Sequence, residues 1–236
     1  MNAPIISYNL ENGVARITLD DGKANVMSET MIKALGQALD QAEQDQAVVL
    51  LTGRQGVFSA GFDLPTLRGG GDAAMRMLNG GFALSARLAG LPLPVLVTSP
   101  GHALAMGIFL VMAADVRIGV KGAFKYGANE VAIGLPVPYT AVELCRARLL
   151  PTVFQRAMMQ AEIFQPEAAQ EGGFIDRVVE AEQLAEVAEE AAAILAKLDR
   201  RAYVATKMRV RAALLESLPA ALQKDDADFR SILSRS

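Results

Sequence analysis

The chain has 236 residues, of which 52% are hydrophobic and 21% charged, and its formal net charge is -3. This length and apolar content allow a sizeable core, and they exclude a disordered or fibrous protein. The weakly acidic balance argues against a general binder of nucleic acid or of anionic membranes, although a local basic cluster could still hold a phosphate.

The cysteine content and the apolar runs indicate the compartment. Cys145 is the single cysteine, so the chain has no intramolecular disulfide and no cysteine-cluster metal site. Residues 1–10 lack the basic region before an apolar core that is typical of an export signal. The longest apolar run, Ala103 to Ala114, is too short to span a bilayer. We therefore expect a cytoplasmic protein with no nucleic-acid, membrane or metal partner.

Two short alternating segments, Ile5–Leu10 and Val14–Leu19, open the chain on either side of an Asn-Gly pair. This pattern predicts a β-hairpin. A polar loop follows, and Ser28 then precedes an amphipathic pattern over residues 29–44, which predicts a capped helix. The N-terminal part is therefore expected to be strand, strand, helix.

A glycine-punctuated stretch, Gly53 to Leu67, follows the apolar run Ala47–Thr52, which predicts a buried strand. Phe58 can anchor the turn in the core. Residues 59–61 have small side chains, so the backbone here could pass close to a ligand and offer it N–H groups. An ordinary connection between a strand and a helix is the alternative interpretation.

The order of strand, turn and helix recurs further along. Residues 68–72 predict a mobile loop and residues 73–89 a helix, after which Val95–Ser99 reads as a strand. Pro100-Gly101 then makes a turn, and a helix is expected over Ala103–Ala114. Two such turns can place two backbone N–H groups around one oxygen atom, an arrangement that stabilises a developing oxyanion.

The last third of the chain is predicted to be mainly helical, after a short strand at Val116–Ile118. Two helices are expected, over Glu180–Arg200 and Ala202–Leu218. Ile194 with Leu195 and Leu198 would form one apolar face, buried against the core or against a neighbouring subunit.

Glu130 is the strongest acid/base candidate from the residues alone. It precedes the apolar residues 131–133, so its carboxylate could be partly desolvated and its pKa raised toward the range useful for proton transfer. A surface glutamate beside a turn is the alternative. Glu143 is a second acid/base candidate, and it could equally lie on a helix surface.

A hydrolytic triad of Ser59, His102 and Asp63 can also be imagined, but Ser59 does not lie in a GxSxG elbow. His102, the single histidine, lies beside the second turn. It could orient a ligand or pack in the interior. Cys145 is interpreted as a small core residue.

The sequence FSAGFDL at Phe58–Leu64 resembles a signature of the enoyl-CoA hydratase/isomerase (crotonase) superfamily. The segment Pro94–Ile118 resembles that family's second signature, and the similarity continues through Phe124–Gly134 and Phe154–Ala157. The resemblance implies an α/β fold, a crotonase-like spiral of ββα units with a C-terminal helical part. We place the spiral core at residues 1–178. By the same resemblance, the helical part at residues 179–236 is expected to pack subunits into a homotrimer or a dimer of trimers.

The resemblance also implies a site for an acyl-CoA thioester, with coenzyme A as part of the substrate and no separate cofactor. Glu130 falls on the family's general acid/base position, and the oxyanion is expected to be held by the backbone N–H groups of Ala60 and Met106. The Met106 side chain is expected to fill part of the acyl pocket. The following residues are expected to contact the substrate: Lys23, Ala24, Ala60, Gly61, Phe62, Asp63, Leu64, Phe109 and Pro138.

Two departures from the family pattern bear on the reaction. Phe109 stands where hydratases of the family have a second glutamate, and Pro136 and Pro138 replace residues whose N–H helps to hold water. These differences favour double-bond isomerisation by one glutamate over hydration of an enoyl-CoA. An acyl-CoA-binding or assembly protein without catalysis is the third hypothesis.

Overall fold

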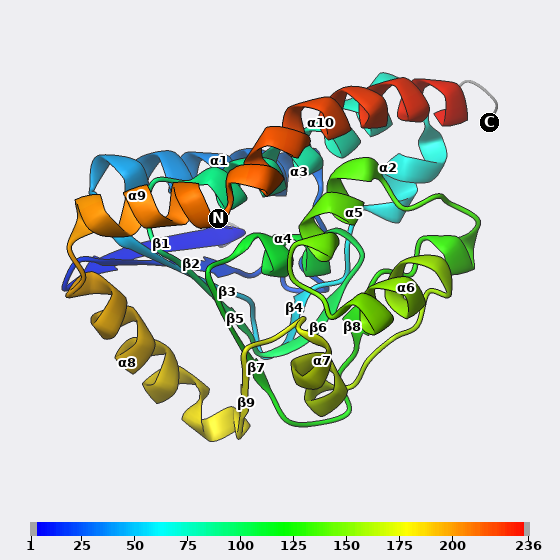
Figure 1. Cartoon of the computed structure of the whole chain (residues 1–236). Coiled ribbons are helices and arrows are strands. Elements are labelled where there is room, and N and C mark those ends of the chain that lie inside the picture. The colour runs from blue at the N-terminus through cyan, green and yellow to red at the C-terminus, as the bar shows by residue number, and fades with distance from the viewer. Residues whose placement is uncertain (1–3, 234–236) are drawn as a thin grey trace.

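The computed structural model describes residues 4–233 (Figure 1). Two short ranges lie outside the described residues: residues 1–3, at the start of the N-terminal segment 1–10, and residues 234–236, at the end of the predicted helical part. The strands are β1 Ile6–Glu11, β2 Val14–Leu19, β3 Val48–Thr52, β4 Gly56–Ser59, β5 Val95–Ser99, β6 Gly101–Leu104, β7 Val116–Val120, β8 Tyr126–Gly127 and β9 Arg177–Val179. The helices are α1 Glu29–Gln44, α2 Leu64–Gly69, α3 Gly71–Gly90, α4 Met106–Ala113, α5 Tyr139–Arg146, α6 Pro151–Met159, α7 Pro166–Gly172, α8 Leu184–Ala196, α9 Arg200–Val210 and α10 Ala212–Leu233, with 3-10 turns η1 Val131–Ile133 and η2 Ala181–Gln183.

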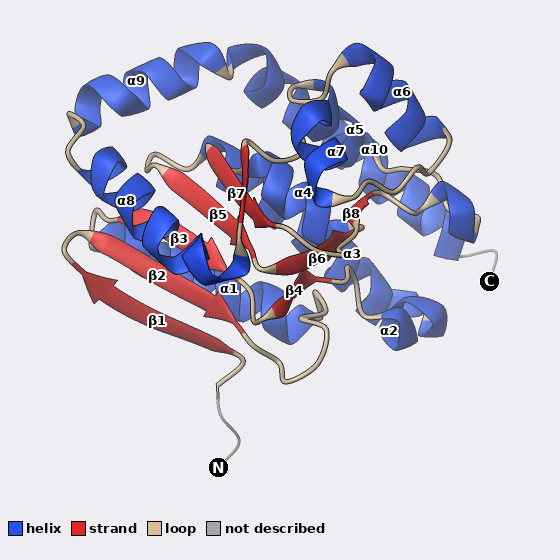
Figure 2. Cartoon of the chain, turned by 90° about the horizontal axis from the view of Figure 1, so that it is seen from below, coloured by secondary structure: helices blue, strands red, loops and turns tan. Residues whose placement is uncertain are grey.

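The strands form two sheets. The larger has the order β1-β2-β3-β5-β7-β9, in which the β1–β2 hairpin is antiparallel and the other pairs are parallel. The smaller is the parallel sheet β4-β6-β8. The chain passes from a strand of the large sheet to a strand of the small sheet and then to helical structure, in β3-β4-α2, β5-β6-α4 and β7-β8-η1. Figure 2 shows the two sheets side by side. The predicted succession of ββα turns is therefore present.

The inner strands β3 and β5 of the large sheet are buried on both faces, as their β-branched and leucine-rich sequences predict, whereas the edge strand β1 is largely exposed. In β3, Val49 and Leu51 lie in the core with residues of α1 and α3, whereas Val48 and Leu50 face the opposite side. That side is covered by α8, whose Val187 packs there together with Ala188 and Ala192. Successive strand side chains point to opposite faces, so one strand serves both cores.

Two boundaries differ from the sequence-based prediction. The helix expected from Ala103 begins only at Met106, because Gly101–Leu104 forms β6 between β4 and β8. Pairing on both sides overrides the helical preference of the alanine-rich sequence. The loop predicted for residues 68–72 is also wrong: α2 ends at Gly69 and α3 begins at Gly71. Gly70 alone separates them, with φ of 64°, a conformation that favours glycine.

The C-terminal helices differ in detail from the prediction. The helix expected over residues 180–200 is α8, which is shorter, and the one expected over residues 202–218 is divided between α9 and α10. Within the predicted apolar face, Leu195 packs on the large sheet, but Ile194 and Leu198 are exposed. Among the described residues, every helix is too short or too polar to cross a lipid bilayer.

Candidate active site

A largely apolar pocket of about 330 Å³ lies between α2, the segment before α5 and the last turns of α10. In Figure 1 the C-terminal end of α10 runs beside α2. Leu64 and Leu67 line it from α2, and Phe229 lines it from α10. The only charged residues of its lining, within the described chain, are Arg68 and Glu130. A long apolar group could therefore enter and meet one carboxylate.

Glu130 is held through its backbone, and its carboxyl group is desolvated. The residue is 9% exposed, and its Oε2 is buried without a hydrogen-bond partner among the described residues. Its backbone C=O accepts hydrogen bonds from the N–H groups of Ile133 and Leu135, each at 3.0 Å. Burial raises the pKa of Glu130 to about 7. The alternative of a solvated surface glutamate therefore does not apply, and the carboxyl group can exchange a proton near neutral pH.

The backbone N–H groups of the first turn, residues 60–62, differ in whether they already donate a hydrogen bond within the protein. The N–H of Ala60 donates to the C=O of Ala24 at 3.0 Å, and the N–H of Gly61 donates to Ser59 Oγ at 3.2 Å. The N–H of Phe62 makes no hydrogen bond within the described residues. The prediction that Ala60 donates to an oxyanion does not fit this arrangement, because its donor is already used. Phe62, two residues further on, has the available N–H.

In the structure the second turn lies at Ala105, between β6 and α4, and it presents a backbone N–H group at the start of a helix. Ala105 adopts φ of 49° and ψ of -126°, an unusual conformation for a residue with a side chain, and Met106 begins α4. The Met106 N–H has no acceptor among the described residues, as expected for the first residue of a helix. A Cβ added to Gly61 would lie 2.7 Å from Ala105 Cβ and 3.5 Å from Met106 N. The two turns are thus in contact, and only glycine fits at their junction.

The predicted substrate contacts separate into two groups. Phe62, Leu64 and Pro138 line the pocket. Phe109 does not: it is fully buried, and its ring lies 6.0 Å from that of Phe82, which does line the pocket. Aromatic packing behind the wall explains why an apolar residue suits this position.

Met106 also lies outside the pocket lining, in contrast to the prediction that its side chain fills part of the pocket. It is fully buried, and its Sδ lies 3.5 Å from the position that a Cβ on Gly81 would take. The backbone N–H is therefore the part of Met106 that could serve the site.

The remaining predicted contacts have structural partners. Asp63 caps α2, because its Oδ2 accepts hydrogen bonds from Thr66 N–H at 3.0 Å and Thr66 Oγ1 at 2.5 Å. Lys23 is exposed, and its backbone C=O accepts a hydrogen bond from Arg54 Nη1 at 2.6 Å. Lys23 and Ala24 thus lie next to the first turn but outside the apolar pocket.

The alternative catalytic residues are engaged elsewhere. His102 Nδ1 accepts a hydrogen bond from the Lys125 N–H at 3.0 Å, and burial lowers the pKa of His102. Glu143 pairs with Arg146 at 3.6 Å, away from the pocket lining. Since Ser59 Oγ accepts from Gly61 and Asp63 caps α2, the imagined triad is not assembled. Cys145 is fully buried in the core, as predicted.

Sequence reasoning missed much of the pocket wall. Phe82 comes from α3, and Phe229, Ile232 and Leu233 come from α10. Their spacing of three and four residues marks one helix face, which was the available signal. The sequence did not show which cavity that face would close, because α10 lies far from Glu130 along the chain.

The family model described as enoyl-CoA hydratase/isomerase matches residues 9–236. Among solved structures, an enoyl-CoA hydratase/isomerase family protein from Pseudomonas syringae is 43% identical, with a TM-score of 0.92 over 94% of this chain and 97% of that one. Human mitochondrial delta3-delta2-enoyl-CoA isomerase is 26% identical, with a TM-score of 0.93 over 98% of this chain and 92% of that one. These similarities confirm the predicted crotonase-like α/β fold.

A curated relative bears a different activity name. A probable enoyl-CoA hydratase of Bacillus subtilis (strain 168) is 33% identical over 140 residues, which are 57% of this chain and 53% of that protein. The chain therefore spans about half the length of this relative. Proteins named hydratase and proteins named isomerase are both similar to the chain, so these names do not decide between the two reactions. The residues of the pocket must be used instead.

Proposed function

The chain belongs to the enoyl-CoA hydratase/isomerase family, and from this membership and its pocket we propose that it is an enzyme that isomerises 3-enoyl-CoA to 2-enoyl-CoA thioesters. Glu130 carries the proposal. It is the single carboxylate among the described residues that line the pocket, and its Oε2 has no partner there. A buried, unpaired carboxylate with a pKa of about 7 is suited to removing and returning a proton.

In the proposed reaction, the ionised Glu130 removes a proton from C2 of the 3-enoyl-CoA. The electrons pass into the thioester carbonyl and form a dienolate, whose oxygen accepts hydrogen bonds from the N–H groups of Phe62 and Met106. The protonated Glu130 then returns the proton to C4, which leaves a double bond between C2 and C3. The proton removed from C2 is returned to C4, so Glu130 ends in its initial protonation state and the reaction needs no oxidant or reductant.

Hydration of a 2-enoyl-CoA is the second candidate, and the hydratase name of the Bacillus subtilis relative favours it. It requires an ordered water besides the acid/base. Pro136 and Pro138 line the pocket without N–H groups, and Phe109 places an aromatic ring behind its wall. These residues support isomerisation over hydration. A binding protein without catalysis is the third candidate, which the desolvated Glu130 disfavours.

A panel of 3-enoyl- and 2-enoyl-CoAs tests the proposal. We expect the 3-enoyl-CoAs to be converted to isomers of unchanged mass with a conjugated double bond. Ultraviolet absorption and chromatography measure this conversion. The 2-enoyl-CoAs should gain water much more slowly, which mass spectrometry detects as a hydroxyacyl-CoA. Rapid hydration without movement of any double bond would assign the chain to the hydratases.

The coenzyme A part is proposed to lie along Lys23 and Ala24, next to the first turn. We also propose a cytoplasmic location, from the single cysteine, and the division into a core of residues 1–178 and a helical part of residues 179–236. Of these, the contact with coenzyme A bears directly on catalysis, because it would hold the thioester at the Phe62 amide.

A homotrimer or a dimer of trimers remains the predicted assembly. Ile194, Leu198 and Val210 of the C-terminal part are exposed, Val210 by 80%, and apolar side chains of this size are favoured in contacts between subunits. We expect light scattering at micromolar concentration to give three or six times the mass of one chain. Val210→Glu should lower that mass if its helix lies at the interface, whereas a wild-type monomer would contradict the prediction.

A further inference from the structure

The carboxylate of Asp225 links the C-terminal helix to the start of another helix. It is 1% exposed, and it accepts hydrogen bonds from the N–H groups of Tyr139 at 2.6 Å and Thr140 at 2.9 Å. These amides begin α5, and Pro138 at the N-cap position provides no side-chain acceptor. A residue of α10, 85 positions away from Thr140, therefore caps α5.

The two segments joined by this cap are two walls of the pocket. Pro136 and Pro138 line it immediately before α5, and Phe229 and Leu233 line it one and two turns after Asp225 on α10. Residues four apart lie on the same helix face. The hydrogen bonds of Asp225 therefore fix the separation between the wall formed by the segment before α5 and the wall formed by α10.

Other contacts hold α10 less specifically. The Phe229 ring stacks on Phe82 at 5.8 Å, and Asn79 Nδ2 donates to Asp226 Oδ1 at 2.7 Å. Both join α10 to α3. Lys224 lies 5.1 Å from the centre of the Tyr139 ring, but a cation beside an exposed ring is a weak contact. Among these side chains, Asp225 alone makes buried hydrogen bonds to the segment that follows Pro138.

We propose that Asp225 is a positioning residue that sets the width of the acyl pocket and thereby the binding of longer acyl chains. This inference rests on the proposed function, because it takes the pocket to hold an acyl group. A short acyl group has few methylenes to place between the segment before α5 and α10. A longer one contacts both walls, and each buried methylene adds to its affinity.

Asp225→Asn tests the role with little change in shape. The asparagine retains one oxygen that can accept a hydrogen bond, but its NH2 group would meet the second backbone N–H, so one of the two bonds is lost. Loosening the wall by the equivalent of about two buried methylenes corresponds to about tenfold in affinity. We therefore expect decanoyl-CoA to bind about tenfold more weakly and butanoyl-CoA to change less than about twofold.

Titration calorimetry with these saturated acyl-CoAs measures binding without turnover. Asp228→Asn is the matched control, because it removes the same charge from the exposed side of α10, and it should bind both ligands as the wild type does. If wild-type protein binds neither ligand, the proposed function fails. If wild-type protein binds both, and Asp225→Asn weakens both equally or neither, the role of Asp225 is overturned.

A second variant keeps the test valid if Asp225→Asn does not fold. Leu233→Ala removes part of the same wall without touching the cap, and it should likewise weaken decanoyl-CoA more than butanoyl-CoA. An equal effect of Leu233→Ala on both ligands would show that α10 does not contact the distal part of the acyl chain, and it would overturn the proposal. Asp225→Glu retains the carboxylate, and we expect it to restore part of the affinity for decanoyl-CoA.

Discussion

Replacing Glu130 by glutamine is expected to lower the rate of isomerisation by about 10²–10⁴-fold, the usual contribution of a positioned general acid/base. Glutamine has nearly the same shape but cannot take up or release a proton at neutral pH. Its side chain would occupy the same pocket wall, so decanoyl-CoA should bind the variant about as tightly as it binds the wild type. A loss confined to kcat would place Glu130 in the chemical step.

Glu143→Gln is the control for this substitution. Glu143 lies in the same region of the chain, but it pairs with Arg146 outside the pocket lining, so turnover should stay within about twofold of the wild type. Single-turnover kinetics on both variants separates binding from chemistry. Wild-type turnover by Glu130→Gln would contradict the proposed mechanism, and an equal loss in Glu143→Gln would indicate that the assignment of the base is wrong.

The raised pKa of Glu130 also predicts two pH dependences. Since the ionised form is the base, kcat/KM should rise with pH through about 7. The pKa of Glu130 in the folded state lies above the ordinary glutamate value of about 4.5, so the favourable contribution of the protonated group is fully present below about 4.5 and lost as the pH rises through about 7. Glu130→Gln should therefore stabilise the fold at pH 8, on the order of 3 kcal/mol, and not at pH 4. Urea unfolding at both pH values measures the difference.

Patterns within one segment predicted the local structure well. The helix over residues 29–44 matches α1, and the Ser28 side chain accepts a hydrogen bond from the Met31 N–H, as its cap. The hairpin and the strand Val95–Ser99 are also confirmed, the hairpin to within one residue. In each, the deciding interactions lie within a few residues of one another, or depend on a continuous apolar run.

Elements formed by pairing between distant segments were missed. Gly101–Leu104 has no strand signal of its own and becomes β6 because β4 and β8 flank it. The prediction of Ala60 as an oxyanion donor has a similar limit: the Ala60 N–H donates to the C=O of Ala24, which lies in another loop, and the motif contains no sign of that hydrogen bond. Whether a backbone N–H group in a turn is free depends on whether a neighbouring segment supplies an acceptor for it. That information is in the tertiary structure and not in the motif.

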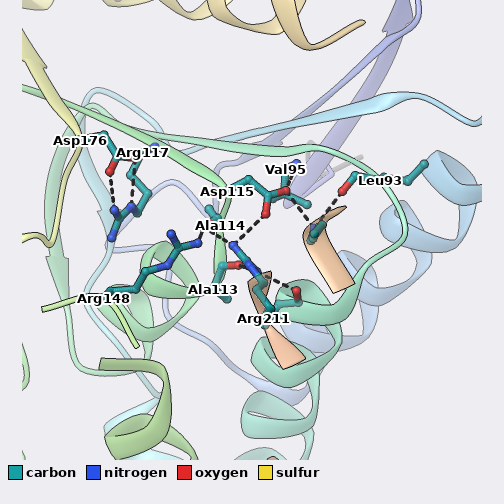
Figure 3. A network of polar contacts seen from close by, with 11 residues as sticks. Leu93, Val95, Ala113, Ala114, Asp115, Arg117, Arg148, Asp176 and Arg211 are labelled. Carbon is teal, nitrogen blue, oxygen red and sulfur yellow. Dashed lines mark hydrogen bonds and ion pairs between the residues drawn. The ribbon is translucent and has the colours of Figure 1, made fainter. Parts of the chain in front are cut away.

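The buried ion network around Asp115 also joins segments that are far apart in the sequence (Figure 3). Asp115 follows α4, and its carboxylate contacts Lys207 Nζ at 2.9 Å and Arg211 Nη2 at 2.8 Å. It also accepts a hydrogen bond from the Val95 N–H at 2.8 Å. Arg211 donates further to the C=O of Ala113 at 2.8 Å, at the end of α4. One carboxylate thus anchors α9 and the residue before α10 to the helix that begins at the second turn.

Asp115→Asn is expected to lower the free energy of unfolding by about 3–5 kcal/mol, because it leaves Lys207 and Arg211 buried without their anionic partner. The Lys207 side chain is 3% exposed, and burial already lowers its pKa to about 8 against the attraction of Asp115. Without that attraction its pKa should fall further, and the ammonium group should lose its proton more readily. Urea unfolding measures the loss.

Glu162→Gln is the control. It breaks an ion pair with Arg156 that is largely exposed to solvent, and it should lower the free energy of unfolding by no more than about 1 kcal/mol. If Asp115→Asn were no more costly than Glu162→Gln, the network could not be what anchors α9 to the core.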